Sequence, residues 1–174
     1  MYGLNRVNQA GEEMYQKNMV SLQHIGSIRA NYQSQRALIR TLMICGHNSQ
    51  EYQDTLSLIQ QAESDMDNYI SLYHPTIVSG DSEDSQSFER FVEVYETDFA
   101  NLKNSVYQMG DTIEQDEVNE FLDSGRTISS KIEEELDHCL ERNTTHASDL
   151  MADNEATYRN FIIFESAMLL IAII

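Results

Sequence analysis

The chain has 174 residues, the size of one ordinary domain. It contains a single proline, seven glycines and no tryptophan, a composition that favours long helices over a loop-rich or all-β fold. Acidic residues outnumber Lys and Arg by 29 to 11, and the resulting net charge of -18 argues against nucleic acid as a partner.

The first predicted helix covers residues 4–45. Residues at a 3-4 spacing form a seam of coiled-coil type with a few polar interruptions. This seam consists of Leu4, Val7, Gly11, Met14, Asn18, Ser21, Ile25, Ile28, Tyr32, Gln35, Ile39 and Leu42. Gly46 is expected to end the helix, and Ser49 is expected to cap the next one.

The second predicted helix covers residues 49–73, and Pro75 ends it because the residue before a proline is pushed out of the helical region. Its seam consists of Tyr52, Leu56, Ile59, Ala62, Met66, Ile70 and Tyr73. Residues 74–86 are rich in Ser, Asp and Gly, so we expect a loop there.

The third predicted helix follows this loop and ends at about Met109, before Gly110. Its seam is entirely apolar or aromatic and consists of Phe88, Val92, Tyr95, Phe99, Leu102, Val106 and Met109. Residues 111–114 read as a capping box that opens a short helix to about residue 122. Asp123-Ser124-Gly125 predicts a break before the fourth helix.

The fourth predicted helix begins near Thr127 and continues into residues 161–174, which are apolar except for Glu165 and Ser166. A membrane helix needs roughly 20 apolar residues, so this run is expected to be the start of a longer one. We therefore divide the chain into a domain over residues 1–160 and the start of a transmembrane helix over residues 161–174. A further membrane helix is expected before Met1.

Four long helices joined by short connections predict an all-α fold, an antiparallel up-down-up-down four-helix bundle. The chain resembles the ligand-binding domain of bacterial methyl-accepting chemotaxis receptors. Three stretches carry the resemblance: Met14-Tyr15-Gln16-Lys17-Asn18 with the apolar pattern after it, the arginine-bearing stretch 28–40, and Ala152-Asp153-Asn154-Glu155-Ala156-Thr157-Tyr158-Arg159 before the terminal apolar run.

The resemblance implies a non-enzymatic sensor domain on the periplasmic or extracellular side of the plasma membrane. It also implies a homodimer that signals by displacing a helix across the membrane. Two alternatives stay open. The same type of sensor serves histidine kinases and nucleotide cyclases, and a bundle of this kind can also be a structural or interaction module without a small ligand.

The most informative local pattern is the absence of Asp and Glu between Met14 and Gln50 in so acidic a chain. Arg29, Arg36 and Arg40 lie in this stretch, seven and four residues apart, and so share one helix face. Arginine forks bind carboxylate or phosphate, which indicates an anion site. The alternative is that these arginines are solvated or paired with acids of neighbouring helices.

In the receptors that this chain resembles, the ligand lies at the dimer interface, between the arginines of the first helix and the start of the fourth. The resemblance therefore implies Arg36, Arg40, Arg126 and Thr127 as ligand-binding residues, near Ser124 and Gly125. Arg29 does not match the third receptor arginine, because Asn31 stands at the expected spacing. The expected partner is a small anion, such as an amino acid or organic acid, or a binding protein.

Other motifs are weak. Glu135-x-x-His138 has the spacing of a di-iron bundle, but the sequence offers no second copy. It also has no haem-attachment motif and no phosphate-binding glycine loop, so no metal or cofactor is expected. Cys45 and Cys139 lie too far apart along their helices for a disulfide, and we expect packed thiols. Asn143-Thr144-Thr145 is a lone glycosylation sequon.

Overall fold

The computed structural model describes residues 11, 19–45, 47–109 and 115–173. Its main elements are α2 (Val20–Ile44), α3 (Gln50–Tyr73), the 3-10 turn η2 (His74–Thr76), α4 (Ser82–Val94), the π-helical turn η3 (Tyr95–Phe99), α5 (Ala100–Gln108) and α6 (Gln115–Ile173). No strand occurs in the described ranges. The predicted all-α fold is therefore confirmed.

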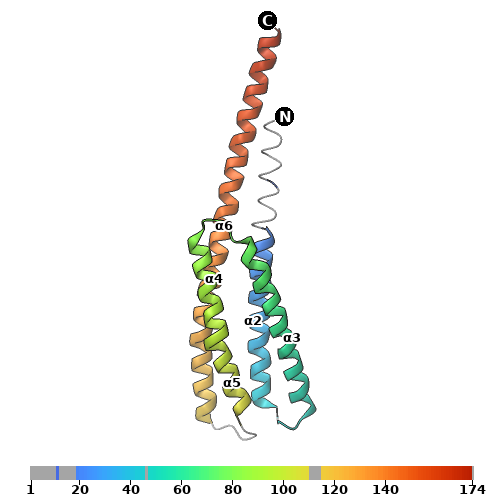
Figure 1. The fold of residues 1–174 in the computed structure, drawn as a ribbon, viewed down its shortest axis with the longest axis vertical. Coiled ribbons are helices and arrows are strands. Elements are labelled where there is room, and N and C mark those ends of the chain that lie inside the picture. The colour runs from blue at the N-terminus through green and yellow to red at the C-terminus, as the bar shows by residue number, and fades with distance from the viewer. Residues whose placement is uncertain (1–10, 12–18, 46, 110–114, 174) are drawn as a thin grey trace.

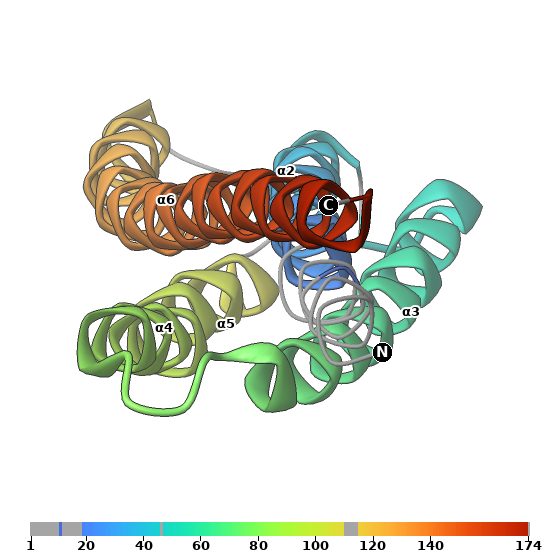
Figure 2. The ribbon, with the colours of Figure 1, turned by 90° about the horizontal axis from the view of Figure 1, so that it is seen from above.

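The helices alternate in direction (Figure 1). α2 descends, α3 ascends, the rod formed by α4, η3 and α5 descends, and α6 ascends and continues beyond the bundle. We call the end at which α2 begins and the α3–α4 connection lies the upper end, as drawn in Figure 1. Figure 2 shows two helix pairs: α2 packs mainly on α3, and α4 packs mainly on α6.

The predicted seam of the first helix is confirmed wherever the structure describes it. The buried residues of α2 are Ser21, Ile25, Ile28, Tyr32, Gln35, Ile39 and Leu42. The predicted seam residues before Val20 and the predicted helix end at Gly46 lie outside the described residues, except for the partly buried Gly11. The apolar spacing alone thus determined which face of α2 is buried.

The second helix also follows its prediction closely. The backbone N–H of Tyr52 donates to the Ser49 hydroxyl at 3.1 Å, so Ser49 caps α3 as expected. The helix ends at Tyr73, two residues before Pro75. Two seam positions differ, since Leu56 and Ile70 are only partly buried, and Thr55 is buried beside Leu56.

The loop predicted over residues 74–86 is wrong in its second half, because α4 already begins at Ser82. Asp81 caps this helix by accepting the backbone N–H of Asp84 at 3.1 Å. Gly80, with φ at +94°, provides the left-handed turn just before the cap. The acidic run after Gly80 is therefore the first turn of a helix, where negative charge is favourable.

The third predicted helix contains a π turn that the sequence pattern did not reveal. The buried residues of this rod include Phe91, Tyr95, Phe99 and Lys103, three successive steps of four. Steps of four exceed the period of an α-helix, so the buried face would rotate away from the core. The π turn at Tyr95–Phe99 accommodates the difference, and it buries Phe91 and Lys103 where Val92 and Leu102 were predicted.

The predicted break at residues 123–125 is wrong, because α6 is one continuous helix from Gln115 to Ile173. Gly125 is partly buried, and a Cβ at this position would lie 3.5 Å from Leu102 Cδ2. Packing against α5 therefore outweighs the weak helix propensity of this glycine, a cost of roughly 1 kcal/mol. The predicted capping box at residues 111–114 lies outside the described residues.

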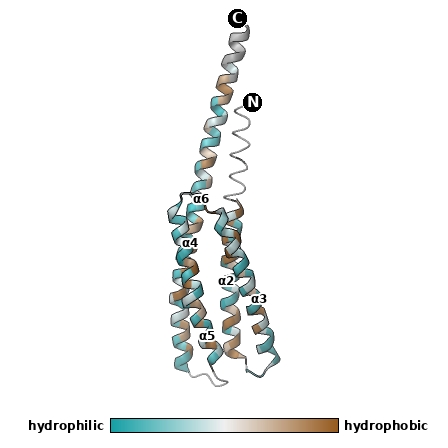
Figure 3. Cartoon of the chain, viewed as in Figure 1, coloured by the Kyte–Doolittle hydropathy of each residue, from teal (hydrophilic) through white to brown (hydrophobic). Residues whose placement is uncertain are grey.

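Hydrophobic and hydrophilic residues alternate along the helices of the bundle (Figure 3). The largest fully buried side chains include Tyr32, Tyr73, Phe88, Phe91 and Phe99. Among the described residues, no helix combines the length and the apolar character that crossing a bilayer requires.

Candidate functional site

The three arginines of α2 have different environments. Arg29 is partly buried and forms ion pairs with the carboxylates of Glu133 and Asp137 on α6. Its Nε lies 3.4 Å from Glu133 Oε2. The alternative of pairing with a neighbouring helix therefore holds for Arg29. Arg36 is partly buried and Arg40 is exposed.

Arg36 and Arg40 form no ion pair with any residue that the structure describes. The Arg36 guanidinium lies over the Tyr32 ring, 5.6 Å from its centroid, and its Nη1 donates to Gln33 Oε1 at 2.8 Å. This stacking holds the guanidinium plane against α2 and leaves donors of its fork without a carboxylate.

Arg36 and Arg40 line a small cavity together with Gly125 and Ser129 of α6. The other lining residues are Ile39, Phe99, Leu102, Phe121 and Leu122. The cavity measures about 20 Å³, which is room for one water molecule. The fold thus brings Arg36 and Arg40 together with Gly125, but the cavity leaves no space for an amino acid.

The two predicted residues of α6 point elsewhere. Arg126 and Thr127 are exposed and are not among the residues that line this cavity. Arg126 Nη1 lies 3.1 Å from Asp123 Oδ1, and the Thr127 hydroxyl donates to the Asp123 carbonyl at 3.1 Å. Both side chains therefore interact within their own helix, and their assignment to a ligand site stays a prediction.

A larger cleft lies between α5 and the first turns of α6. It measures about 560 Å³, and its walls include Asp98, Glu117 and Glu120 above an apolar floor that contains Leu102 and Phe121. The sequence did not reveal this cleft, because its walls come from two helices, and the apolar spacing within each helix does not show which helices lie side by side. Three carboxylates disfavour an anion, so this cleft does not suit the ligand expected from the arginines.

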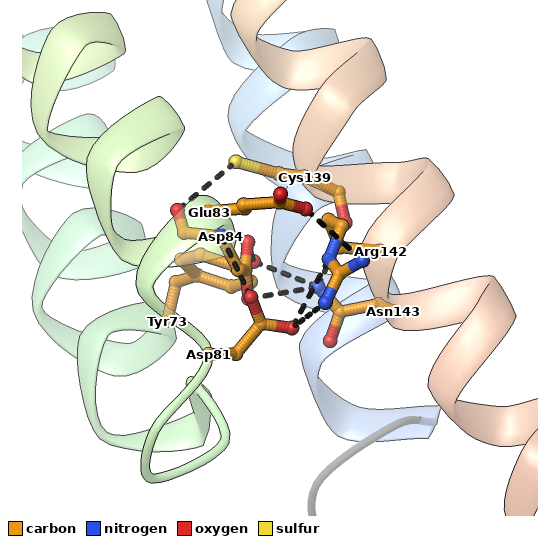
Figure 4. Close-up of polar contacts among 7 residues, drawn as sticks. All are labelled: Tyr73, Asp81, Glu83, Asp84, Cys139, Arg142 and Asn143. Atoms are coloured by element: carbon orange, nitrogen blue, oxygen red, sulfur yellow. Dashed lines mark hydrogen bonds and ion pairs between the residues drawn. The ribbon is translucent and has the colours of Figure 1, made fainter.

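A buried polar cluster lies near the upper end, and Figure 4 shows its members from α3, α4 and α6. The Tyr73 hydroxyl donates to Asp84 Oδ1 at 2.7 Å, and Asn143 Nδ2 donates to Asp84 Oδ2 at 3.2 Å. Asn143 Nδ2 also lies 2.8 Å from the Tyr73 hydroxyl and from the Cys139 carbonyl, while its Oδ1 accepts the Ser21 hydroxyl at 2.6 Å. The cluster links α2, α3, α4 and α6 through one side chain.

Burial dominates the electrostatics of this cluster. It raises the pKa of the Asp84 carboxyl, although hydrogen bonds from Tyr73, Cys139 and Asn143 act in the opposite direction. Burial likewise raises the pKa of the Tyr73 hydroxyl and of the Cys139 thiol, and the negative charge of Asp84 adds to both shifts. Burial thus shifts all three groups toward their uncharged forms.

Two partly exposed ion pairs that share Arg142 border the buried cluster (Figure 4). Arg142 Nη2 lies 2.9 Å from Asp81 Oδ2, and Arg142 Nη1 lies 3.1 Å from Glu83 Oε2. Partial burial alone would raise the pKa of Asp81, but the backbone N–H of Asp84 and the Arg142 fork lower it. Arg142 thus holds the α4 cap against α6.

The structure also gives the positions of the weaker motifs. Glu135 accepts two hydrogen bonds from Arg90, at 2.7 and 2.9 Å, while His138 is exposed. Among the described residues, no group of three His, Cys, Asp or Glu side chains is arranged to hold a metal ion. Asn143 is only 2 % exposed, so its sequon is inaccessible to glycosylation in the folded chain.

A second polar layer lies in the middle of the bundle. The buried Gln35 lies within hydrogen-bond distance of the Tyr95 hydroxyl through both amide atoms, at 2.9 and 3.1 Å. Ser129 donates its single hydroxyl hydrogen to the Gly125 carbonyl at 2.6 Å. The Tyr32 hydroxyl, 2.9 Å from the Ser129 oxygen, is therefore the donor of the bond between them. Burial raises the pKa of Tyr95 to about 12.

The two cysteines are free, in agreement with the prediction. Cys139 is fully buried, and its thiol lies 3.9 Å from the Asp84 carbonyl. Cys45 is partly buried at the end of α2. The thiols therefore belong to opposite ends of the bundle.

The fold and these sites can now be compared with known proteins. A family model described as a four helix bundle sensory module for signal transduction matches residues 1–158. No curated protein and no solved structure matches the chain significantly. The match covers most of the chain and includes all the helices that form the bundle. The chain therefore belongs to the family of four-helix-bundle sensory modules found in methyl-accepting chemotaxis proteins.

Proposed function

We propose that this chain is the non-enzymatic, ligand-sensing domain of a transmembrane chemoreceptor, located on the periplasmic or extracellular side of the plasma membrane. The observation that supports it best is the continuity of α6, which runs without a break from the lower end of the bundle to a point well above it. At 1.5 Å per residue, such a helix is roughly 90 Å long and transmits a displacement along its whole length.

The sensing step that we propose is the binding of a small anion, such as an amino acid or organic acid, by Arg36 and Arg40. Both guanidinium groups lie in a chain of net charge -18 and form no ion pair with a described residue. The cavity beside them is too small for such a ligand in one subunit. A homodimer would supply the second wall, and ligand binding between the subunits would shift α6 relative to α2.

Isothermal titration calorimetry against amino acids and di- and tricarboxylic acids tests this proposal. We expect one compound to bind, and we expect Arg36→Ala and Arg40→Ala each to weaken binding at least tenfold, since a lost charged hydrogen bond costs about 1.5–3 kcal/mol. Arg90→Ala is the matched control, because it removes an arginine that is paired with Glu135 on α6. Arg126→Ala and Thr127→Ala test the α6 side of the site.

The proposal fails if no compound binds and if the Arg36→Ala and Arg40→Ala variants of the full receptor signal normally. Sedimentation of the chain at increasing concentration tests the homodimer separately. A histidine kinase or cyclase sensor would behave identically in these assays, and only the output region of the parent protein distinguishes it.

One observation favours the alternative of an interaction bundle without a small ligand. The space between the α2 arginines and α6 is nearly filled, and Arg29 is already paired with Glu133 and Asp137. A dimer that binds none of the compounds but retains a protein partner, such as a binding protein, would support this alternative.

A further inference from the structure

The carboxylate of Asp84 is an unusual group for the interior of a helical bundle. Its residue is only 2 % exposed, and its two oxygens accept from Tyr73 and Asn143. Both donors are uncharged, and Asp84 forms no ion pair with a described residue. Buried carboxylates are rarely found without a cationic partner, because removal of the charge from water is costly.

Two helices contribute hydroxyl groups to the surroundings of Asp84. α3 provides the Tyr73 hydroxyl, and the next residue, His74, packs its ring against Phe88 at 6.5 Å between centroids. α2 provides the hydroxyl of Ser21, which reaches the cluster through the side chain of Asn143. Neither helix therefore places a cation on the carboxylate.

α6 contributes a cation beside this cluster, but that cation is engaged elsewhere. Arg142 pairs with Asp81 and Glu83, both on the first turn and cap of α4 (Figure 4). α6 also provides the thiol of Cys139, which lies 3.9 Å from the Asp84 carbonyl oxygen and adds no positive charge. The negative charge of Asp81 further disfavours ionisation of Asp84.

When Asp84 is ionised, the hydroxyl of Tyr73 and the amide of Asn143 both donate to its carboxylate. A proton added to Oδ2 would place an O–H opposite the N–H of Asn143, and two donors cannot bond each other. A proton added to Oδ1 would face the Tyr73 hydroxyl, which already accepts from Asn143 at 2.8 Å. Protonation therefore forces this network to rearrange.

We propose that Asp84 is a proton-binding site through which the domain responds to acid, because a proton bound there breaks the hydrogen bonds that join α4 to α6 through Asn143. The site lies at the upper end of the bundle, where α6 leaves its partners. It shares no residue with the cavity at Arg36 and Arg40. A proton at Asp84 thus acts on the same helix as the proposed anion but from a separate site.

The direction of the stability change follows from the burial of the carboxyl. Burial raises the pKa of Asp84, so the folded chain binds the proton more tightly than the unfolded chain does. This contribution to the free energy of unfolding is fully present below the unfolded pKa of about 3.9 and is lost as the pH rises through the folded pKa. The wild type should therefore lose stability relative to Asp84→Asn as the pH rises through that range.

Nuclear magnetic resonance on the whole chain tests the proposal directly. The side-chain carboxyl carbon of Asp84 and the side-chain amide of Asn143 are followed between about pH 7.5 and pH 4, on either side of the expected transition. We expect both to titrate with one midpoint above that of exposed aspartates, together with backbone amides of α6 around Asn143. In Asp84→Asn these amides should not titrate, whereas Asp149→Asn, which removes an exposed carboxyl of α6, should behave like the wild type.

Tyr73→Phe provides a second test that does not depend on the folding of Asp84→Asn. It removes a donor to the ionised carboxylate, so the common midpoint should rise by about one pH unit. The proposal is overturned if Asp84 titrates at or below the midpoint of Asp149, or if the Asn143 amide does not follow it. Both outcomes leave the proposed anion site unaffected, because calorimetry at constant pH tests that site independently.

Discussion

The pair Gln35 and Tyr95 allows a quantitative test of the polar layer in the middle of the bundle. Gln35 is fully buried and Tyr95 nearly so. In Tyr95→Phe, the buried amide oxygen of Gln35 loses its donor, at a cost of about 1–3 kcal/mol. In Gln35→Leu, the Tyr95 hydroxyl loses its partner at a similar cost. If the two effects were independent, the double variant would lose about 2–6 kcal/mol.

The structure predicts a much smaller loss for the double variant. Leu and Phe leave no buried polar atom of this pair without a partner, and both have volumes close to those of the residues they replace. We therefore expect Gln35→Leu/Tyr95→Phe to be destabilised by about 1 kcal/mol or less, with a coupling free energy of at least about 1 kcal/mol. Asn31, which also accepts from Gln35, is only partly buried and can bond water instead.

The assay is urea unfolding followed by circular dichroism at one pH and one protein concentration, with a double-mutant cycle over the four proteins. Tyr69→Phe is the matched control, because Tyr69 is partly buried and its hydroxyl makes no hydrogen bond to a described residue. It should change the free energy of unfolding by less than about 0.5 kcal/mol. A double variant that loses the full sum of the single losses would refute the reasoning.

Three further predictions concern other parts of the bundle. Gly125→Ala should stabilise the chain by roughly 0.5–1 kcal/mol in thermal unfolding, because α6 is helical there and the new Cβ meets Leu102 at an ordinary contact distance. A destabilised variant would instead support the helix break predicted at residues 123–125. Arg29→Met should lower the free energy of unfolding by no more than about 1 kcal/mol, because the ion pairs of Arg29 are partly exposed. High salt should abolish this difference from the wild type, because it screens the same ion pairs. A maleimide should modify Cys45 in the native chain and Cys139 only after unfolding, and mass spectrometry measures both modifications. Equal rates of modification for the two thiols in the native chain would contradict the burial of Cys139.

The three arginines of the first helix show how far the sequence reaches at the candidate anion site. The absence of acids between Met14 and Gln50 pointed to Arg29, Arg36 and Arg40 as candidates, and their role as an anion site stays a prediction. The sequence did not separate them, because the carboxylates that pair with Arg29 are more than a hundred positions away along the chain. Helix pairing, which brings Glu133 and Asp137 beside Arg29, decides which arginine is neutralised.

The sequence by itself determined the class of fold and most of the buried faces. Apolar spacing specifies the inner face of a helix because each turn repeats the same geometry, and the seam of α2 was correct at every described position from Ser21 to Leu42. It also indicated the cap of α3 at Ser49, whose signal is local.

Only the tertiary structure decided features that depend on partners distant in sequence. Packing against α5 keeps α6 helical through Gly125, and the core contacts of Tyr95 and Phe99 require a π turn. Asp84 and Asn143, separated by 59 positions, meet because α4 packs on α6. A buried polar side chain is recognised from its partners, and those partners exist only once the helices have packed.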